Sequence, residues 1–402
     1  MKINTDPKKI EEILTRGVEK IYPNPQVLKK KMLSGKRIRL YCGYDPSNPN
    51  FHLGHLGTLK KLAQFQSLGH EVIMLVGDFT GMIGDPTDKT VVRRKLSRKE
   101  VLFNSRHYKK LASKFLNFGG KNPVKILYNS QWQDKLTFKD LIELASNFTV
   151  QQMIVRHMFQ DRIKKGKPIY LHEFLYPLAQ AYDSCVMDVD LEIGGKDQIF
   201  NMLCGRDLMK ILKKKEKIVM AIKLLTDPTG EKMGKTRDNM IIINEKPEEM
   251  YGKIMAWPDS FLEFAFELLT NVPQKEIKTI LKAIKLKSLN PRDLKARLAR
   301  EIVLTCHNEK SAILAEKEFN RIFQEKKLPS KIPEIEIKEK VLNILDLLIK
   351  TKLVFSKAEA KRLILQGGVR IDGRRERNWK KKMEIKKGKI IQIGKRRLVR
   401  II

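Results

Sequence analysis

The sequence has few cysteines and no long apolar run. Its four cysteines, Cys42, Cys185, Cys204 and Cys306, lie far apart and form no C-x-x-C pair, so they indicate neither a disulfide framework nor a zinc site. No stretch approaches the roughly 18 apolar residues that a membrane span needs. The charged start MKINTDPKKIEEIL also lacks the apolar core of a signal peptide. These features predict a cytoplasmic protein with no metal site of its own and no membrane association.

Acidic residues are scarce relative to basic ones. The 402 residues include 81 Lys and Arg but only 46 Asp and Glu, which gives a formal net charge of +35. A field of this strength attracts polyanions, so nucleic acid is the first partner to consider. A lysine-rich proteome or a hot habitat could produce the same surface, and charge alone leaves both interpretations open.

Short apolar runs alternate with helical periods between about Arg37 and Phe200. The apolar runs that indicate strands are IRLYCGY, EVIMLVGDF, KIL and DLEIGG, and LGTLKKLAQFQSLG has the period of a helix. Strands that alternate with helices predict an α/β fold with a parallel sheet. In such sheets, ligands bind at the carboxyl ends of the strands, where a helix N-terminus also offers N–H groups to phosphate.

The composition predicts four parts along the chain. Residues 1–240 form a catalytic domain on the parallel sheet, with a mostly helical insert at about 96–169, and residues 241–325 form an α-helical domain. Residues 326–340, with little periodicity, form a linker, and residues 341–402 form a small basic α+β domain.

The last domain has the charge and the turn signals of a nucleic-acid-binding module. Residues 351–402 contain 18 Lys and Arg against 4 Asp and Glu. Ser356 and Glu359 predict a helix start, Gly367 and Gly368 its end, and Asp372-Gly373 a hairpin turn. A basic helix against a small sheet can follow a phosphate backbone, although a merely solvated basic face is the alternative.

The first strand runs directly into two histidines, in HLGH. His52 and His55 share one face of a helix, where they could bind a metal, pack structurally or donate hydrogen bonds to a phosphoryl group. Gly43 and Gly54 remove side chains where a base or a phosphate could approach the backbone. The motif alone leaves these three interpretations open.

A second motif, EKMGKTR, follows the turn signal DPTG. Its lysines, Lys232 and Lys235, are three residues apart beside a glycine, which is typical of a flexible cationic loop. The loop could close on a triphosphate and steady a leaving pyrophosphate. An ordinary exposed loop would have the same composition.

Polar residues also interrupt the apolar stretch HEFLYPLAQAYDS. Tyr176, Gln180 and Asp183 follow one another at steps of four and three, on one face of one helix. Burying such groups without partners would cost about 1 to 3 kcal/mol each, so we expect them to line a cavity. A surface stripe is the alternative.

Taken together, these motifs resemble those of a known enzyme family. YCGYDPSNPNFHLGHLG, GMIGDPTDK, HEFLYPLAQAYDS, EIGGKDQ and EKMGKT, in this order, resemble the signature set of the bacterial-type tyrosyl-tRNA synthetases. HLGH is similar to the first class I motif and KMGKT to the second. The C-terminal LLIKTKLVFSKAEAKRLILQGGVRIDGR resembles the small RNA-binding domain, first described in a ribosomal protein, that ends many of these enzymes. The resemblance covers essentially the whole chain and implies a Rossmann-like nucleotide-binding domain.

The resemblance implies a role for each matching residue in binding the amino acid. Tyr41 and Asp183 would hold the phenolic hydroxyl group of tyrosine, and Gln198 would lie at its carboxylate. The residues that would receive the ammonium group are Tyr176, Gln180 and Asp85, with Asp45 nearby.

It also implies roles in binding ATP and RNA. Gly195 and Asp197 would meet the ribose of ATP, and Gly43, Ser47 and Gly54 would lie along the nucleotide. The residues that would bind the ATP phosphates or the leaving pyrophosphate are His52, His55, Lys89, Arg93, Lys232, Lys235 and Thr236. The expected RNA contacts in the basic domain are Lys357, Lys361, Arg362 and Arg370.

Three positions depart from the family pattern. Gly234 replaces the serine of the second motif but leaves both lysines in place. Ser47 stands where relatives can have threonine, so a hydroxyl group is kept. Lys196 lies next to the ribose contact, where threonine or serine is common, and nothing in the sequence explains it.

The implied activity is ligation of tyrosine to tRNA(Tyr). ATP, accompanied by Mg²⁺, would activate tyrosine as tyrosyl-adenylate, and a homodimer would form through the insert. A tryptophan-specific relative would share both phosphate motifs, but an indole has no hydroxyl group to satisfy Tyr41 and Asp183. A non-catalytic RNA-binding protein on the same scaffold is the third hypothesis, and the presence of both histidines and both lysines speaks against it.

Overall fold

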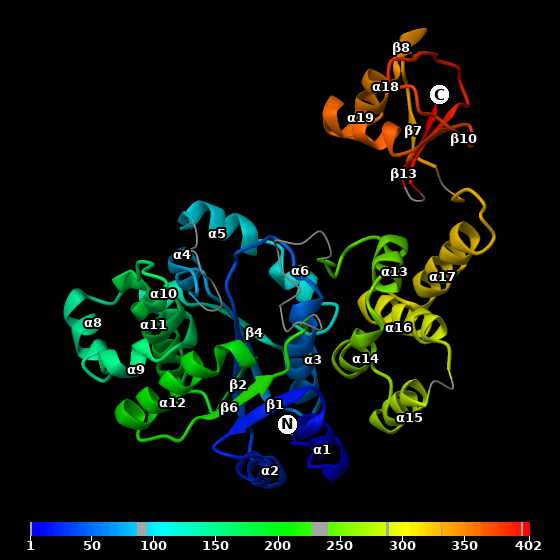
Figure 1. Cartoon of the computed structure of the whole chain (residues 1–402). Helices are drawn as coiled ribbons and strands as arrows, with labels where there is room; N and C mark the ends of the chain where they lie inside the picture. The colour runs from blue at the N-terminus through cyan, green and yellow to red at the C-terminus, as the bar shows by residue number, and fades with distance from the viewer. Residues whose placement is uncertain (1, 87–94, 227–239, 287–288, 331, 395–396) are drawn as a thin grey trace. The chain divides into compact units, whose positions relative to one another are not determined.

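The computed structural model describes residues 2–86, 95–226, 240–286, 289–330, 332–394 and 397–402. The chain divides into two compact units, Met1–Ala312 and Ile313–Ile402 (Figure 1). The division falls inside helix α17 (Glu309–Phe323), which connects the units as one continuous element.

Unit 1 is built on a six-stranded sheet with the order β1-β6-β5-β2-β3-β4. The edge strand β1 runs antiparallel to β6, and the other neighbours are parallel, which confirms the expected parallel core. The strands are β1 (Val18–Tyr22), β2 (Arg39–Tyr44), β3 (Glu71–Val76), β4 (Lys125–Tyr128), β5 (Leu191–Gly195) and β6 (Ile218–Ile222).

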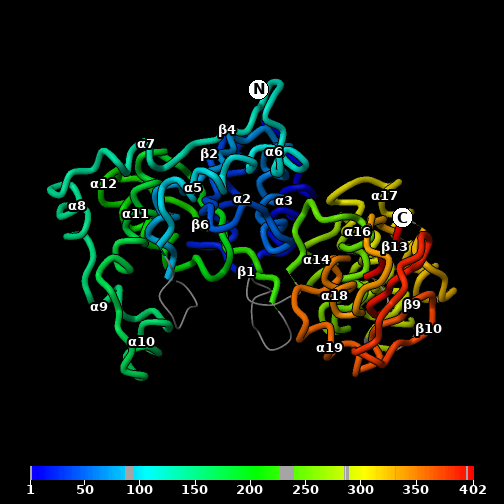
Figure 2. The backbone as a smooth tube through the Cα atoms, turned by 90° about the horizontal axis from the view of Figure 1, so that it is seen from above, coloured from blue at the N-terminus to red at the C-terminus, as the bar shows by residue number. Residues whose placement is uncertain are grey.

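Helices cover both faces of this sheet. Helix α3 (Leu53–Ser67) lies on one side, and α11 (Leu171–Met187) and α12 (Ile199–Lys213) lie on the other (Figures 1 and 2). Strands β3 and β6 are therefore buried along nearly their whole length, as their continuous apolar sequences require. The order of the strands reverses between β2 and β5, so their carboxyl ends border the crevice where α/β proteins bind ligands.

The segment expected as an insert is mostly helical and also contributes the edge strand β4. Helix α8 (Phe138–Ala145) packs against α11, and α10 (His157–Lys164) contacts the start of α11 through Phe159 and Phe174. The remaining helices before α11 are α1 (Pro7–Thr15), α2 (Pro25–Leu33), α4 (Thr80–Ile83), α5 (Arg98–Ser105), α6 (Tyr108–Ala112), α7 (Ser130–Gln133), α8 (Phe138–Ala145), α9 (Val150–Ile154) and α10 (His157–Lys164).

A helical region follows the sheet. Its helices are α13 (Pro247–Met255), α14 (Leu262–Leu269), α15 (Gln274–Lys285) and α16 (Pro291–Cys306). Helix α13 packs against α16, and α14 contacts α3, so this region is joined to the part of unit 1 that contains the sheet. Tyr251, Leu298 and Ile302 are almost fully buried between these helices.

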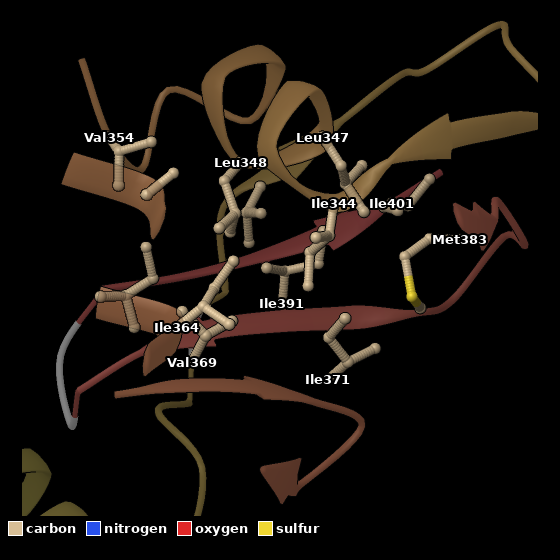
Figure 3. Close-up of a cluster of buried hydrophobic side chains, with 13 residues drawn as sticks. Ile344, Leu347, Leu348, Val354, Ile364, Val369, Ile371, Met383, Ile391 and Ile401 are labelled. Carbon is tan, nitrogen blue, oxygen red and sulfur yellow. The ribbon is translucent and has the colours of Figure 1, made fainter. Parts of the chain in front are cut away.

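Unit 2 pairs two helices with a small sheet. Helices α18 (Ile344–Lys350) and α19 (Lys357–Leu365) bury Leu347, Leu348 and Ile364 against strand residues such as Ile391 (Figure 3). The strands are β7 (Glu334–Ile335), β8 (Val341–Asn343), β9 (Val369–Ile371), β10 (Arg374–Arg375), β11 (Lys382–Glu384), β12 (Ile390–Ile393) and β13 (Arg397–Ile401). Five of them pair in the order β10-β9-β12-β13-β7, and β11 pairs with β8.

The local signals of unit 2 agree with its backbone. Asp372 and Gly373 have φ values of 48° and 81° and join β9 to β10, as a type I′ hairpin turn requires. Ser356 accepts a hydrogen bond from the Glu359 N–H at the start of α19. One difference is β7, which lies inside the stretch 326–340 that was expected to be a linker. Two residues are too short to give a periodic signal, and their pairing with β13 depends on the distant end of the chain.

We predict that Leu347→Ala lowers the free energy of unfolding of unit 2 by about 2 to 5 kcal/mol, because the deleted methyl groups leave a cavity in its core. The exposed Leu365 in the same unit is the control, and Leu365→Ala should change stability by less than about 0.5 kcal/mol. Hydrogen exchange of peptides from residues 341–402 in increasing urea measures both. Equal losses would show that α18 does not form the core of this unit.

Candidate active site

The histidine motif forms the start of helix α3. His52 is the N-cap, and its Nδ1 accepts a hydrogen bond of 3.1 Å from the Gly54 N–H. Nδ1 of His55 accepts one of 3.2 Å from the His52 N–H. A neutral imidazole that accepts at Nδ1 carries its proton on Nε2. The cap therefore fixes both rings as Nε2–H donors at the positive end of a helix, which suits an anionic phosphate.

Glycine at position 54 is required by this arrangement. A Cβ atom there would lie 2.7 Å from Cε1 of His52, which is closer than a side chain tolerates. At Gly43, by contrast, a Cβ would meet no atom within 4 Å, so this part of β2 borders open space. Both observations agree with a site in which a ligand lies against the backbone.

The segment after the second lysine motif is attached to the histidines. The Leu53 N–H donates to the Ile241 carbonyl and the Ile243 N–H donates to the Phe51 carbonyl, each at 2.9 Å. His52 and Ile242 form the antiparallel bridge between these two bonds. Lys232, Lys235 and Thr236 lie outside the described residues, as do Lys89 and Arg93.

Asp183 lies at the centre of a buried hydrogen-bond network. Its side chain on α11 is almost fully buried, and its carboxylate accepts hydrogen bonds from Asn129, Trp132 and Gln133 at 3.1, 2.7 and 2.8 Å. Burial raises the pKa of Asp183 to about 7, although these three donors lower it, and the negative charge of Glu192 raises it slightly further. The network holds the carboxylate in one orientation.

Tyr41, on the central strand β2, points toward the same helix. Its hydroxyl oxygen lies 2.9 Å from Oγ of Ser184, the neighbour of Asp183. Burial, followed by the negative charges of Glu192 and Asp183, raises the pKa of Tyr41 well above its usual value. Tyr41 therefore remains protonated and can donate a hydrogen bond.

The other two polar residues of α11 contact the loop after β2 and strand β5. The Tyr176 hydroxyl donates to Asp45 at 2.8 Å, and Nε2 of Gln180 donates to Glu192 at 2.9 Å. Tyr176 and Asp183 are buried, which excludes a surface stripe for these two residues. Asp45 also accepts a hydrogen bond from Thr80 at 2.7 Å, so it is fixed from two sides.

A further carboxylate lies where the chain leaves α4. Asp85 is buried, with Nη2 of Arg156 3.8 Å from one of its oxygens. Its other oxygen accepts a hydrogen bond of 2.5 Å from Nε2 of Gln198, in the short helix η1 (Lys196–Gln198) at the end of β5. Two sequence motifs that are far apart in the chain, GMIGDPTDK and EIGGKDQ, thus meet at one place.

The remaining residues expected at the nucleotide lie on the same edge of the sheet. The Ser47 N–H donates to the Asp45 carbonyl at 2.7 Å, which bends the loop after β2. Gly195 ends β5, and a Cβ there would collide with the carboxylate of Asp197. Lys196 forms a 3.4 Å ion pair with Glu19 on β1, which gives this unexpected cation a partner on the edge strand.

The basic residues expected to contact RNA are exposed in unit 2. Lys357 forms a 2.7 Å ion pair with Asp346, and Nζ of Lys361 lies 4.2 Å from the ring centroid of Trp379. Arg362 and Arg370 also lie on the surface of this unit. Trp379, which is flanked by Lys361 and Lys380, was not among the residues identified from the sequence.

Sequence reasoning also missed the partners of Asp183. Asn129, Trp132 and Gln133 lie in and next to α7, directly after β4. The sequence signal that could have found them is the polar stretch NSQWQ at the carboxyl end of a predicted strand.

Comparison with known proteins gives the family. Residues 33–324 match the family model described as tRNA synthetases class I (W and Y), and residues 324–398 match the model described as Tyrosine–tRNA ligase SYY-like C-terminal domain. The chain belongs to the class I tRNA synthetases of the tryptophan and tyrosine group.

Relatives of this synthetase match it over nearly their whole length. The tyrosine–tRNA ligase of Moorella thermoacetica is 43% identical over 97% of the chain and 94% of the relative, and that of Thermotoga maritima is 41% identical over 98% of each. Two solved structures share the fold. The C-terminally truncated mitochondrial tyrosyl-tRNA synthetase of Aspergillus nidulans has a TM-score of 0.64 and 22% identity, covering 78% of this chain and 94% of that chain. The Archaeoglobus fulgidus tyrosyl-tRNA synthetase complexed with L-tyrosine has a TM-score of 0.61 and 20% identity, covering 77% of this chain and all of that one.

We predict that Asp183→Asn removes a pH dependence of stability from this synthetase. The pKa of Asp183 is about 7 in the folded chain and 3.8 for an ordinary Asp, so the folded chain binds the proton more tightly. The wild-type chain should lose stability relative to the variant as the pH rises from about 4 to 7, by up to about 1.4 kcal/mol per pH unit.

Urea unfolding at several pH values measures this difference. The exposed Asp134, which forms an ion pair with Arg98, is changed to Asn as the control for removing a carboxylate from the same part of the chain. A slope of the opposite sign for Asp183→Asn would show that the carboxylate is stabilised in its charged form.

Proposed function

We infer that the chain is a tyrosine–tRNA ligase. Curated tyrosine–tRNA ligases are 41–43% identical to it over nearly its whole length. The observation that carries the choice of amino acid is the buried pair of hydrogen-bonding groups, Tyr41 on β2 and Asp183 on α11. A tyrosine hydroxyl group can satisfy both of them.

The reaction has two steps. A carboxylate oxygen of tyrosine attacks the α-phosphorus of ATP, an O–P bond forms, and pyrophosphate leaves with the electrons of the broken bond. A ribose hydroxyl at the 3′ end of tRNA(Tyr) then attacks the carbonyl carbon of tyrosyl-adenylate, and AMP leaves. The protein binds and orients the reactants and stabilises developing charge.

The amino acid would bind between β2, α11 and η1. Tyr41 donates a hydrogen bond to the phenolic oxygen of the substrate, and Asp183 accepts a hydrogen bond from the phenolic hydroxyl group. Tyr176, Gln180 and Asp85, with Asp45 behind Tyr176, receive the ammonium group. Gln198, which bonds Asp85, lies toward the carboxylate.

ATP would bind along the carboxyl edge of the sheet and the start of α3. The fixed Nε2–H groups of His52 and His55 donate to phosphate oxygens, and Gly43 leaves space for the nucleotide. Asp197 and Gly195 meet the ribose, and Ser47 and Gly54 line the approach. The loop lysines Lys232 and Lys235, with Thr236, and the basic pair Lys89 and Arg93 complete the phosphate contacts in this proposal.

Mg²⁺ would enter with ATP as part of the nucleotide substrate. The ion prefers phosphate oxygens and water to an all-protein cage. Among the described residues, no group of three His, Cys, Asp or Glu side chains is arranged to hold a metal. The protein's part is therefore to position the phosphates through its histidines and cations.

tRNA would contact unit 2 and the helical region of unit 1. Lys357, Lys361, Arg362 and Arg370 attract the phosphate backbone, and Trp379 offers a ring on which a base can stack. We place the reaction in the cytoplasm, where the four free cysteines remain reduced. No described helix is long and apolar enough to cross a membrane.

A second copy of the chain is proposed to cover the insert. Large apolar side chains on α8, α9 and α11 are exposed, among them Phe138 at 78%, Val150 at 70% and Leu171 at 82%. An exposed apolar face of this kind favours association, and a homodimer would bury it.

We predict that the wild-type chain exchanges pyrophosphate into ATP with tyrosine and not with phenylalanine or tryptophan. Phenylalanine lacks the hydroxyl group that would bond Tyr41 and Asp183, and the loss of such a buried hydrogen bond is the effect for which tyrosine enzymes of this family are the standard example. Asp183→Ala should reduce the preference for tyrosine by at least about tenfold. Asp134→Ala is the control. Exchange with tryptophan instead, or an unchanged preference in Asp183→Ala, would overturn this assignment.

We further predict that a chain ending at Phe323, the end of α17, keeps tyrosine-dependent exchange but loses at least about tenfold in tRNA charging, because the phosphate contacts of unit 2 are gone. The full-length variant Lys361→Glu with Arg370→Glu changes the charge of unit 2 without removing the unit. It should also weaken tRNA charging. Undiminished charging by both proteins would remove unit 2 from the tRNA-binding surface.

A further inference from the structure

A fully buried ion pair lies beside the proposed tyrosine site. Nζ of Lys217 forms it with the carboxylate of Glu192, and the two side chains are 0% and 3% exposed. Lys217 directly precedes β6, and Glu192 is the second residue of β5. In the register of the sheet, Glu192 stands next to Tyr41 on β2. The sheet thus places the ion pair beside Tyr41, which is proposed to bind the phenolic hydroxyl group of the substrate.

The ion pair is bonded to two residues of the site. Nζ of Lys217 donates to Oγ of Ser184 at 2.8 Å, and Ser184 lies 2.9 Å from the Tyr41 hydroxyl. On the other side, Glu192 accepts a hydrogen bond of 2.9 Å from Nε2 of Gln180. Two continuous chains of contacts therefore run from the ion pair to the residues proposed to hold the phenolic and ammonium groups of tyrosine.

The ammonium group also decides the direction of the hydrogen bonds. Lys217 can only donate, so Ser184 must accept from it and keeps its own proton for another acceptor. The Tyr41 oxygen at 2.9 Å is within the usual range for that bond, whereas the second oxygen of Glu192 lies at 3.4 Å. When Ser184 donates to Tyr41, the Tyr41 O–H is left to point at the phenolic oxygen of the substrate.

Helix α12 leaves space for the ammonium group at one residue. A Cβ atom at Gly205 would collide with Nζ of Lys217 and lie 3.1 Å from Oγ of Ser184. Glycine inside a helix is less favourable than alanine by about 1 kcal/mol. Gly205 is thus unfavourable for the helix itself, but it leaves the space that Lys217 and Ser184 occupy.

We propose that the buried Lys217–Glu192 pair is a positioning element for substrate recognition: through Ser184 it orients the Tyr41 hydroxyl as a donor to tyrosine, and through Gln180 it fixes the ammonium contact. The proposal rests on the tyrosine site described under the proposed function. It assigns a role in specificity to Lys217, Glu192 and Ser184.

Stability alone is a weak reason for this pair. A buried ion pair can often be replaced by uncharged residues of similar size without loss of stability, because removing charges from water is costly. A second pair of similar burial, Arg162 with Glu173, lies on α10 and α11, and its further hydrogen bonds join Pro168 and Tyr170. It supplies a control for the general effect of removing a buried pair.

The test is a double-mutant cycle on the full chain. One arm is the combined change Lys217→Met and Glu192→Gln, which removes both charges and keeps an acceptor for Gln180; the other arm is Ser184→Ala. Pyrophosphate exchange gives kcat and KM for tyrosine and for phenylalanine, and thermal unfolding shows that each variant is folded. The control is Arg162→Met with Glu173→Gln.

Each arm should reduce the ratio of kcat/KM for tyrosine to that for phenylalanine by about tenfold or more, mainly through the KM for tyrosine, with the KM for ATP unchanged. Because both arms act through Tyr41, the combined variant should lose much less than the product of the two reductions. The control pair should leave the ratio unchanged.

Three results would overturn the proposal: an unchanged ratio in folded Ser184→Ala, multiplicative losses in the cycle, or an equal loss in the control. If Lys217→Met with Glu192→Gln does not fold, Ser184→Ala and Gly205→Ala serve as the test, because the methyl group of Gly205→Ala pushes the ammonium group away from Ser184. An unchanged ratio in either of these variants would also overturn the proposal. Absence of tyrosine-dependent exchange in the wild-type chain would instead refute the proposed function.

Discussion

Buried polar groups beneath the carboxyl edge of the sheet constrain the rest of unit 1, because each of them needs a partner. Asp183, Glu192 and Lys217 are all buried, and an unpaired group among them would cost about 1 to 3 kcal/mol or more. Their partners come from α7 and the residue before it, from β5, from α11 and from the residue before β6. Satisfying these groups therefore fixes how the strands and the long helix are placed relative to one another.

The same arrangement prepares the site before a ligand arrives. The buried carboxylate of Asp183 is held by three donors, and the histidines are fixed as donors by backbone N–H groups at the start of α3. Little reorganisation is then needed when tyrosine and ATP bind, and this is how fixed dipoles and donors contribute to phosphoryl-centre chemistry. Gly54 leaves space for the His52 ring, and Gly205 leaves space for the ammonium group of Lys217.

Local patterns in the sequence predicted the elements that depend on neighbouring residues. The strands β2, β3, β4 and β5, the helix after His52 and the Asp372-Gly373 turn all follow from short-range periodicity or turn chemistry. The family motifs named the residues that we propose to contact the ligands. The strand β7 and the ion pair of Lys217 with Glu192 could not be predicted in this way. Their partners are distant in the chain, as with Tyr41 and Ser184, which are 143 residues apart. A lysine before an apolar strand is expected at the surface, and only the fold shows that Lys217 is buried.

Recognition of the phenolic hydroxyl group is tested most directly by equilibrium binding. L-Tyrosine and L-phenylalanine are titrated into the full chain without ATP or tRNA. Calorimetric titration separates this recognition from the chemistry that follows it. Tyrosine should bind at least about tenfold more tightly, because phenylalanine has no hydroxyl group to accept from Tyr41 or to donate to Asp183 in a buried site. Equal affinities for the two amino acids would contradict the assignment of these residues to the substrate.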